Sequence, residues 1–163
     1  MRVEAKLEEM ELALPEPVKP PPGVRLSFAW VRVRGDLAYV SGHGPLNLDG
    51  SPAGPFGKVG LEVSPEEGYQ AARLTALSVL GSLKRELGDL DRVSAWLMVR
   101  GMVNAAPDFG ATTNVINGFS DLILELYGPE TGMHARTAVG MATLPLGLPV
   151  TIAAEVEVSA VGP

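Results

Sequence analysis

The stretch that decides the fold is MHARTAVGMATLPLGLPVTIAAEVEV, residues 133–158. It predicts two β-strands joined by a loop rich in proline and glycine. The second strand has the alternation typical of a half-buried strand. One face carries Val150, Ile152, Ala154, Val156 and Val158, and the other carries Thr151, Ala153, Glu155 and Glu157.

Arg136 is the unusual residue of the first strand. It shares a strand face with Ala138, Gly140 and Ala142, which are too small to fill the space around a guanidinium. A cation on such a face predicts a hollow that receives an anion, because arginine pairs with a carboxylate through two parallel hydrogen bonds and never deprotonates. Two plainer interpretations stay open: a structural ion pair with a glutamate on a neighbouring strand, and a solvated arginine at a sheet edge.

The composition predicts one domain, or one domain with a terminal arm. The chain has 163 residues, of which 46% are hydrophobic and 20% charged, so it can build a proper core. No apolar run is long enough to span a bilayer and no charged-then-apolar leader is visible, which favours a cytoplasmic location. The absence of cysteine excludes disulfides, a thiol nucleophile and a thiolate metal site. The net charge of −6 argues against a general nucleic-acid binder.

The N-terminal residues predict a helix and a connector. Residues 1–14 place Val3, Leu7, Met10 and Leu14 at helical spacing, which indicates a short amphipathic helix docked on the body. The helix ends at Pro15, and PEPVKPPPG (15–23) predicts a stiff extended connector. We therefore expect residues 1–23 to form an arm and residues 24–163 to form the domain.

A hairpin follows the connector. Two apolar runs between Phe28 and Ser41 flank Gly35-Asp36, which suits a tight two-residue turn. The second run continues into SGHGP (41–45), where two glycines flank His43. Such a loop leaves backbone N–H groups exposed and gives a ligand room to approach, although a plain flexible turn explains it equally well.

Two helices and an intervening strand occupy the middle of the chain. Ser64, Pro65 and Glu67 form a helix start with a capping box, and Gly88 marks the end of that helix. A second helix lies between Pro107 and Gly128; Asn117, near its start, is either a surface residue or a donor aimed at a site.

Residues 92–104 predict a strand that is apolar on both faces. We expect one face to carry Val93, Ala95, Leu97, Val99 and Val103, and the other to carry Trp96, Met98 and Met102 with Ser94 and Arg100. Both faces then need a cover, which favours an oligomer. The order of two strands, helix, strand, helix and two strands predicts an α+β fold, with one mixed sheet and two helices on one of its faces.

Four segments together resemble the Rid family of reactive-intermediate deaminases, also called YjgF-type or "endoribonuclease L-PSP" proteins. They are SGHGPL, the helix that begins SPEEGYQAARL, NAAPDFGATTNVINGFSDLILELYG, and HARTAVGMATLPLGLPVTIAAEVEV. The resemblance runs from about Arg25 to Val158. It implies a chorismate-mutase-like fold, a homotrimer with clefts between subunits, and hydrolysis of a 2-imino or enamine acid to a 2-oxo acid and ammonia. Neither metal nor cofactor is implied.

The resemblance also implies a set of site residues. Arg136 stands where the family arginine holds the substrate carboxylate, and Asn117 matches a pocket asparagine. The substrate-binding turn corresponds to Ser41, Gly42 and His43, with histidine in place of the usual glutamine. Phe28 matches a pocket tyrosine without its hydroxyl.

Thr151 departs from the family pattern. It takes the place of a glutamate that positions the hydrolytic water, so Arg136 and Thr151 are the expected catalytic pair. Threonine can hold a water but cannot act as a base near neutral pH; Glu155, Glu157 and His43 are alternatives. Three functions follow: a deaminase, a trimer that binds a small carboxylate metabolite or acts as a chaperone without chemistry, and a ribonuclease, which the acidic composition disfavours.

Overall fold

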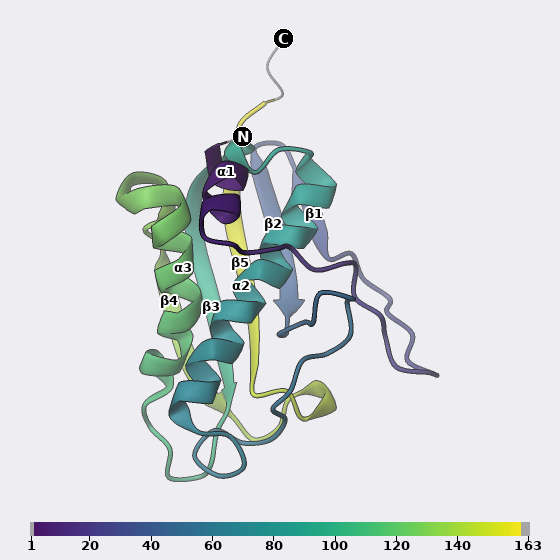
Figure 1. Cartoon of the computed structure of the whole chain (residues 1–163), viewed down its shortest axis with the longest axis vertical. Coiled ribbons are helices and arrows are strands. Elements are labelled where there is room, and N and C mark those ends of the chain that lie inside the picture. Colours follow the sequence, from purple (N-terminus) through teal and green to yellow (C-terminus); the bar gives the residue numbers. More distant parts are fainter. Residues whose placement is uncertain (1, 161–163) are drawn as a thin grey trace.

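The computed structural model describes residues 2–160 and contains one mixed five-stranded sheet in the order β1-β2-β5-β3-β4 (Figure 1). The strands are β1 (Val31–Arg34), β2 (Leu37–His43), β3 (Val93–Asn104), β4 (Ala135–Met141) and β5 (Val150–Val158). β3 and β4 are parallel, and the other neighbouring pairs are antiparallel. The predicted α+β class and the predicted order of elements are confirmed.

Helices α2 (Pro65–Leu87) and α3 (Thr112–Gly132) pack side by side on one face of the sheet, with α1 (Arg2–Glu9) beside them (Figure 1). The core lies between these helices and the sheet, and its largest buried side chains include Leu80, Leu83, Phe119, Ile123, Trp96 and Ile152. Two short 3₁₀ helices complete the fold: η1 (Leu90–Arg92) and η2 (Pro145–Gly147). The prediction of two helices on one sheet face is confirmed.

The helix boundaries follow local chemistry. At the start of α2 the Ser64 hydroxyl accepts from Glu67 N (3.1 Å), and the Glu67 carboxylate accepts from Ser64 N (2.8 Å). At its end Gly88 has φ 80°, a left-handed conformation that favours glycine. In α3 the backbone leaves helical geometry at Gly128, before Pro129, where the sequence predicted the end; one more turn follows to Gly132.

The predicted faces of β3 are wrong at its middle. Trp96 is buried together with Val93 and Val99, whereas Leu97 is 41% exposed, so Trp96 and Leu97 lie on the faces opposite to those expected. The reason is two register irregularities against β5, between Val93 and Ala95 and between Trp96 and Met98. Each extra residue shifts the side chains that follow to the opposite face, which strict alternation cannot anticipate. The β5 alternation is confirmed, with every second residue from Val150 buried.

The sheet face opposite the helices keeps apolar side chains accessible. Tyr39 (45% exposed) on β2, Leu97 on β3 and Val139 (44%) on β4 lie on strands across its width. An apolar sheet face of this kind is typical of a subunit interface. The homotrimer stays a prediction.

The N-terminal helix is shorter than predicted. It ends at Glu9, and Glu11 has φ 56°, so Met10 and Leu14 pack on the core from irregular chain. The connector then runs along the loop after β2, where Glu16 N donates to Leu48 O (2.9 Å) and Lys19 N to Gly50 O (3.0 Å). Among residues 2–160, no helix has the length and apolar character needed to cross a bilayer.

Candidate functional site

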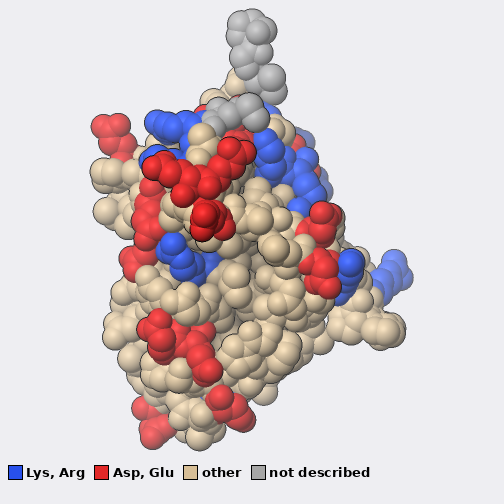
Figure 2. All heavy atoms as spheres, viewed as in Figure 1, with Lys and Arg blue, Asp and Glu red and all other residues tan. Residues whose placement is uncertain are grey.

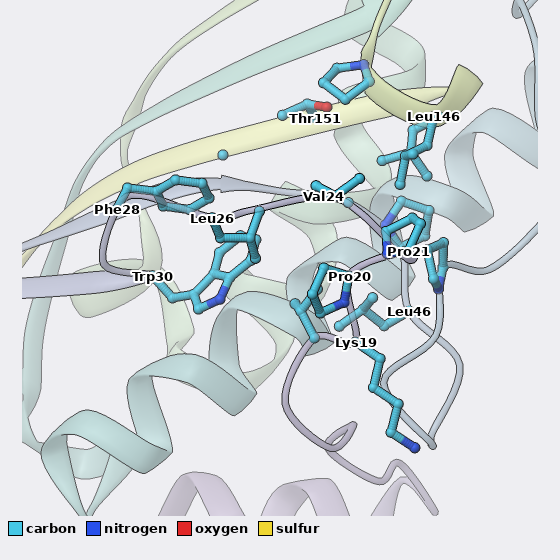
Figure 3. Close-up of a pocket in the computed structure, with 17 residues that line it drawn as sticks. Lys19, Pro20, Pro21, Val24, Leu26, Phe28, Trp30, Leu46, Leu146 and Thr151 are labelled. Atoms are coloured by element: carbon cyan, nitrogen blue, oxygen red, sulfur yellow. The ribbon is translucent and has the colours of Figure 1, made fainter.

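An apolar cavity of about 390 Å³ lies between the connector and η2 (Figure 3). Leu26, Phe28 and Trp30 lie at one end of it, and Pro21 and Leu146 lie at the other. The connector, predicted only as a stiff spacer, supplies part of the wall through Val18, Pro20 and Pro21, and Val24 and Leu26 just after it extend that wall. Its run of apolar residues was the signal that sequence reasoning passed over. The volume is in the range of small-molecule sites.

Gly42 and Thr151 form the strand side of this cavity. A Cβ on Gly42 would lie 2.8 Å from Thr151 Cγ2, so glycine permits the close approach of β2 and β5 here. The Thr151 hydroxyl oxygen is buried and has no hydrogen-bond partner among the described residues. A buried hydroxyl without a partner destabilises a fold by about 1–3 kcal/mol.

Ser41 and His43 do not line the cavity. The Ser41 hydroxyl donates to Ala29 O (2.6 Å), and its amide donates to Trp30 O (3.0 Å). His43 points to the helix side, where Nδ1 lies 2.6 Å from Ser41 O and Nε2 lies 2.8 Å from the Ser82 hydroxyl. It is 1% exposed and its ring lies 4.7 Å from the Trp30 indole. These contacts place His43 in the core.

Burial lowers the pKa of His43 to about 4. The imidazole is therefore neutral near pH 7. Because the carbonyl of Ser41 can only accept, Nδ1 carries the proton and Nε2 accepts from Ser82. Neither ring nitrogen is free for a molecule in the cavity.

Arg136 lies on the edge strand β4 and reaches α3. Its Nη1 donates to Asn117 Oδ1 (2.9 Å) and to the Ser120 hydroxyl (3.0 Å), and its Nη2 donates to the carbonyl of Thr113 (3.4 Å). Arg136 and Asn117, each named from the sequence as a site residue, thus lie in direct contact. Among residues 2–160 no ion pair joins this guanidinium to a carboxylate. The ion-pair interpretation therefore does not describe it, and Arg136 lies partly exposed on the edge strand.

The guanidinium retains capacity for a ligand. It has five N–H donors, of which three meet the neutral acceptors just described. Burial lowers the pKa of Arg136, and the charge of Asp121 raises it. A partly buried cation fixed by neutral groups attracts an anion more strongly than one in bulk water.

The small-residue face of β4 does not leave an empty hollow. The start of α3 and the chain directly after β3 pack against it. The Thr112 hydroxyl donates to Ala138 O (3.0 Å), and a Cβ on Gly140 would lie 3.3 Å from that of Ala105. The small side chains therefore serve close packing, and the expected hollow is wrong in this respect.

Ser120 and His134 join Arg136 at this edge, and sequence reasoning missed Ser120. The Ser120 hydroxyl lies 2.8 Å from His134 Nε2, and His134 Nδ1 lies 2.7 Å from Gly132 O. The only sequence signal was the placement of His134 two residues before Arg136. That position on the strand by itself favours a structural or interface role for His134.

Within one chain the predicted site residues form two separate groups. Phe28, Gly42 and Thr151 share the cavity, whereas Arg136 and Asn117 lie at the β4 edge. Strand β3 separates β4 from β5, so the two strands lie roughly 10 Å apart at the usual spacing. Arg136 also faces the helices, whereas Thr151 is on the opposite sheet face.

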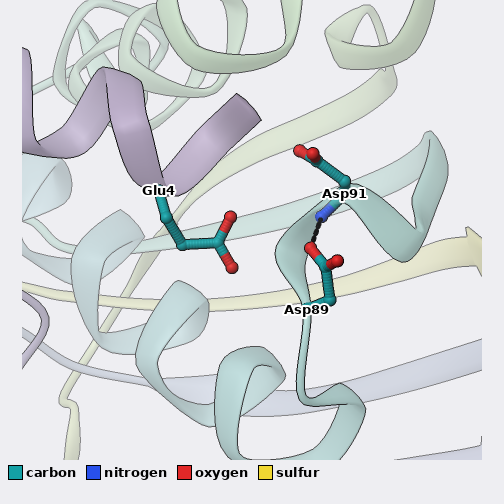
Figure 4. Close-up of side chains that lie close together, drawn as sticks. All are labelled: Glu4, Asp89 and Asp91. Carbon is teal, nitrogen blue, oxygen red and sulfur yellow. Dashed lines mark hydrogen bonds between the residues drawn. The ribbon is translucent and has the colours of Figure 1, made fainter. Parts of the chain in front are cut away.

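A cluster of three carboxylates lies elsewhere, where α1 meets η1 (Figure 4). Asp91 accepts from the backbone amides of Arg2 and Val3. Glu4 accepts from Leu90 N (3.0 Å) and Lys84 Nζ (2.8 Å). Asp89 accepts from Asp91 N (2.9 Å). Burial raises the pKa of Asp91, but the N-terminal positive charge and these amide hydrogen bonds outweigh it and bring the pKa to about 2. The cluster anchors the N-terminal helix.

Comparison with known proteins assigns this chain to a family. Residues 33–155 match the family model described as "YjgF/chorismate_mutase-like, putative endoribonuclease". Protein TCP17 of Trypanosoma cruzi is 38% identical over 158 residues, which are 97% of this chain and 95% of that protein.

Two solved structures have the same fold over nearly the whole chain. The Agrobacterium tumefaciens protein Atu1372 is 35% identical, with a TM-score of 0.85, and the match covers 98% of this chain and 93% of that one. A Shewanella oneidensis protein with the same endoribonuclease description is 28% identical, with a TM-score of 0.86 and coverage of 97% and 100%. The chain belongs to the YjgF/chorismate-mutase-like family, the Rid-type family that its motifs resemble.

Proposed function

We propose that this protein binds a small 2-oxo or 2-imino carboxylate between the subunits of a homotrimer and hydrolyses the imine to a 2-oxo acid and ammonia. The observation that carries the proposal is the state of Arg136. Its guanidinium is oriented by Asn117 and Ser120, has no carboxylate partner among the described residues, and has donors to spare. A carboxylate supplies the missing charge and accepts from two of those donors in parallel.

Two half-sites would combine across the subunit boundary. Arg136 and Asn117 come from one subunit, and the wall formed by Phe28, Gly42 and Thr151 comes from its neighbour. The separation of these groups within one chain supports this arrangement, because no movement of side chains alone brings them together. The accessible apolar residues on the helix-free sheet face support a subunit contact.

The cavity and the Thr151 hydroxyl suggest which part of the site binds the substrate side chain and which part binds the water. The apolar wall receives the side chain of the substrate, which favours acids derived from amino acids with apolar side chains. Thr151 holds the attacking water through its unpaired hydroxyl. An imine carbon is already electrophilic, so positioning of the water and of the carboxylate accounts for much of the rate increase.

The direct test measures 2-oxo acid release from imines generated in situ by an amino acid oxidase. We expect Arg136→Ala to lower kcat/KM by about 10- to 100-fold, the value of a charge-assisted hydrogen-bonded pair. Glu86→Gln, which changes an exposed charge on α2, should match the wild type. Equal rates for wild type and Arg136→Ala would rule out the proposal, and sedimentation equilibrium tests the trimer separately.

A second candidate is a trimer that binds the metabolite without chemistry. Two observations favour it: threonine occupies position 151, where the resembled family uses a glutamate, and His43 is committed to the core. Saturable thermal stabilisation by a 2-oxo acid, together with no release of 2-oxo acid from imines, would select this candidate.

Ribonuclease activity is the weakest candidate. The net charge is −6, and Figure 2 shows acidic and basic side chains mixed on the visible face. RNA binding needs a basic surface, commonly with aromatic side chains for stacking. We expect no RNA binding at low ionic strength, measured by fluorescence anisotropy of a labelled single strand.

A further inference from the structure

The hydrogen bonds around Ser120 have only one consistent direction in the neutral state. A guanidinium can only donate, so Ser120 Oγ accepts from Arg136 Nη1 (3.0 Å). A carbonyl can only accept, so His134 Nδ1 carries a proton and donates to Gly132 O (2.7 Å). Nε2 of the neutral ring is therefore an acceptor, and the Ser120 hydroxyl donates to it (2.8 Å).

We propose that Ser120 and His134 form a proton relay that serves the molecule held by Arg136. This inference rests on the proposed function and adds to it the group that moves the proton. Ser120 passes the proton between the bound molecule and Nε2 of His134. The relay supplies the base that neither Thr151 nor His43 can supply.

The relay has two states that differ in the direction of one hydrogen bond. With Nε2 unprotonated, the Ser120 hydroxyl points to the ring. When Nε2 gains a proton, it becomes a donor to Ser120 Oγ, which then accepts from both His134 and Arg136. The Ser120 proton must then point elsewhere, and the bound molecule is the partner that the proposal assigns to it.

The position of the two residues suits this role. Ser120 retains 8% exposure and His134 is only partly buried, so a molecule on Arg136 can lie against the serine. The carboxylate of such a molecule would share one guanidinium with Ser120. Both Nη1 hydrogens are used, so this carboxylate accepts from the donors left on Nη2 and Nε. In the proposed complex the second carbon of the molecule, one bond from the carboxylate, is turned toward the serine oxygen.

Ser120 and His134 together carry the proton that the hydrolysis moves from water to the amino nitrogen. For a protonated imine, the water oxygen bonds to the second carbon and the C=N electron pair moves onto nitrogen. One water proton goes to Ser120 as the Ser120 proton goes to Nε2. In the second step the proton returns along the same path to the amino nitrogen, and the C–N bond breaks with its electrons on nitrogen. The proton of the new hydroxyl group then moves to the released ammonia, which gives ammonium and the 2-oxo acid.

The electrostatics of the site agree with a base in the empty state. Burial lowers the pKa of His134, the hydrogen bond to Gly132 O opposes this, and the charge of Arg136 lowers the pKa further. Two other charged groups lie on the packed helices. Asp121 accepts from Tyr69 Oη (2.7 Å), and its charge also acts on Arg136. Glu125 pairs with Arg73 (3.1 Å). A bound carboxylate offsets the Arg136 charge, so the pKa of His134 should rise when the site fills.

The first experiment is an NMR pH titration with and without saturating 2-oxobutyrate. The chain has two histidines, so His43, buried in the core, serves as an internal reference. We expect the His134 pKa to rise on ligand binding and the His43 pKa to stay constant. Ligand binding with no change at His134 would overturn the relay.

The second experiment compares binding with turnover in variants. Gln has an acceptor that can replace Nε2 but does not titrate, so His134→Gln should keep 2-oxobutyrate affinity within about threefold and lower kcat by about 100-fold, the lower range for general acid–base catalysis. Ser120→Ala should lower kcat similarly, whereas Ser78→Ala, which removes a buried hydroxyl inside α2, should not.

The outcomes separate the two proposals. A wild type that neither binds 2-oxobutyrate nor releases 2-oxo acid refutes the proposed function and the relay with it. An active wild type that loses activity with Arg136→Ala but keeps it with His134→Gln refutes the relay alone. A loss of kcat in His134→Gln that flattens the lower limb of the pH profile supports the relay, since reduced stability would not move that limb.

Discussion

Two hydrogen-bond networks in this molecule have the same order of groups but different surroundings. In each, an arginine donates to a serine, the serine contacts histidine Nε2, and histidine Nδ1 contacts a backbone carbonyl. The core network consists of Arg85, Ser82, His43 and the Ser41 carbonyl, and the edge network consists of Arg136, Ser120, His134 and the Gly132 carbonyl.

The difference lies in what covers each network. In the core network Trp30 covers the imidazole and His43 is 1% exposed, while Arg85 donates its other nitrogen to Pro15 O (3.0 Å). In the edge network the ring of His134 is only partly buried. The same local chemistry therefore serves to position the connector in one place and presents a cation and a base in the other.

The largest expected effect comes from a variant that removes His43 from the core network. We expect His43→Ala to lower the free energy of unfolding by about 2–4 kcal/mol, because it leaves a core cavity and strands the partners of the ring. His134→Ala should cost less than about 1 kcal/mol, since water can enter at the edge. Urea denaturation of both variants measures the difference, and equal losses would remove the distinction between the networks.

The pH dependence of stability should come mainly from the core network. The folded pKa of His43 is lowered from 6.5 to about 4, so the unfolded chain binds the extra proton between these values. The contribution is complete above pH 6.5 and is lost as pH falls toward 4, by at most about 3 kcal/mol.

His43→Gln should flatten the stability profile between pH 4 and 6.5, measured by urea denaturation across that range. Asp91, with its pKa lowered to about 2, adds its loss only as pH falls below about 4. A His43→Gln profile that matches the wild type would contradict the assignment of this window to His43.

Matched arginine variants sharpen the comparison. Arg136→Met should weaken 2-oxobutyrate binding at least tenfold, about 1.4 kcal/mol, with little change in stability. Arg85→Met should instead lower stability by about 1 kcal/mol through loss of the bonds to Ser82 and Pro15. Calorimetric titration and denaturation of the same two proteins give both readouts, and a reversed pattern would exchange the roles assigned to the networks.

The smallest effect concerns the Thr151 hydroxyl, which, unlike the Ser82 hydroxyl, has no hydrogen-bond partner among the described residues. Thr151→Val keeps the shape of the side chain and removes the buried oxygen, so the free energy of unfolding should rise by up to about 1 kcal/mol. Turnover should fall if Thr151 holds the attacking water. A loss of stability would indicate that this hydroxyl has a partner in solution.

Local signals predicted the elements well because their causes are local. The capping box of Ser64 and Glu67, the Gly88 stop and the Gly128-Pro129 break each depend on a few adjacent residues, and all are present. The faces of β3 at Trp96 and Leu97 failed because bulges arise from pairing with β5, some sixty residues later. The candidate site was found only in part. Arg136, Asn117, Phe28, Gly42 and Thr151 were named from the family motifs, but their division into two groups follows from strand order.

The sequence by itself determined the element types, the α+β class and the family, since periodicity, caps and motifs are written in neighbouring residues. Only the tertiary structure decided that one histidine is core and the other lies beside Arg136, and that the connector closes a cavity. Exposure and partner choice depend on which distant segments pack together. A residue such as His43, flanked by glycines in an open-looking turn, gives no local sign that Trp30 and Ser82 will enclose it.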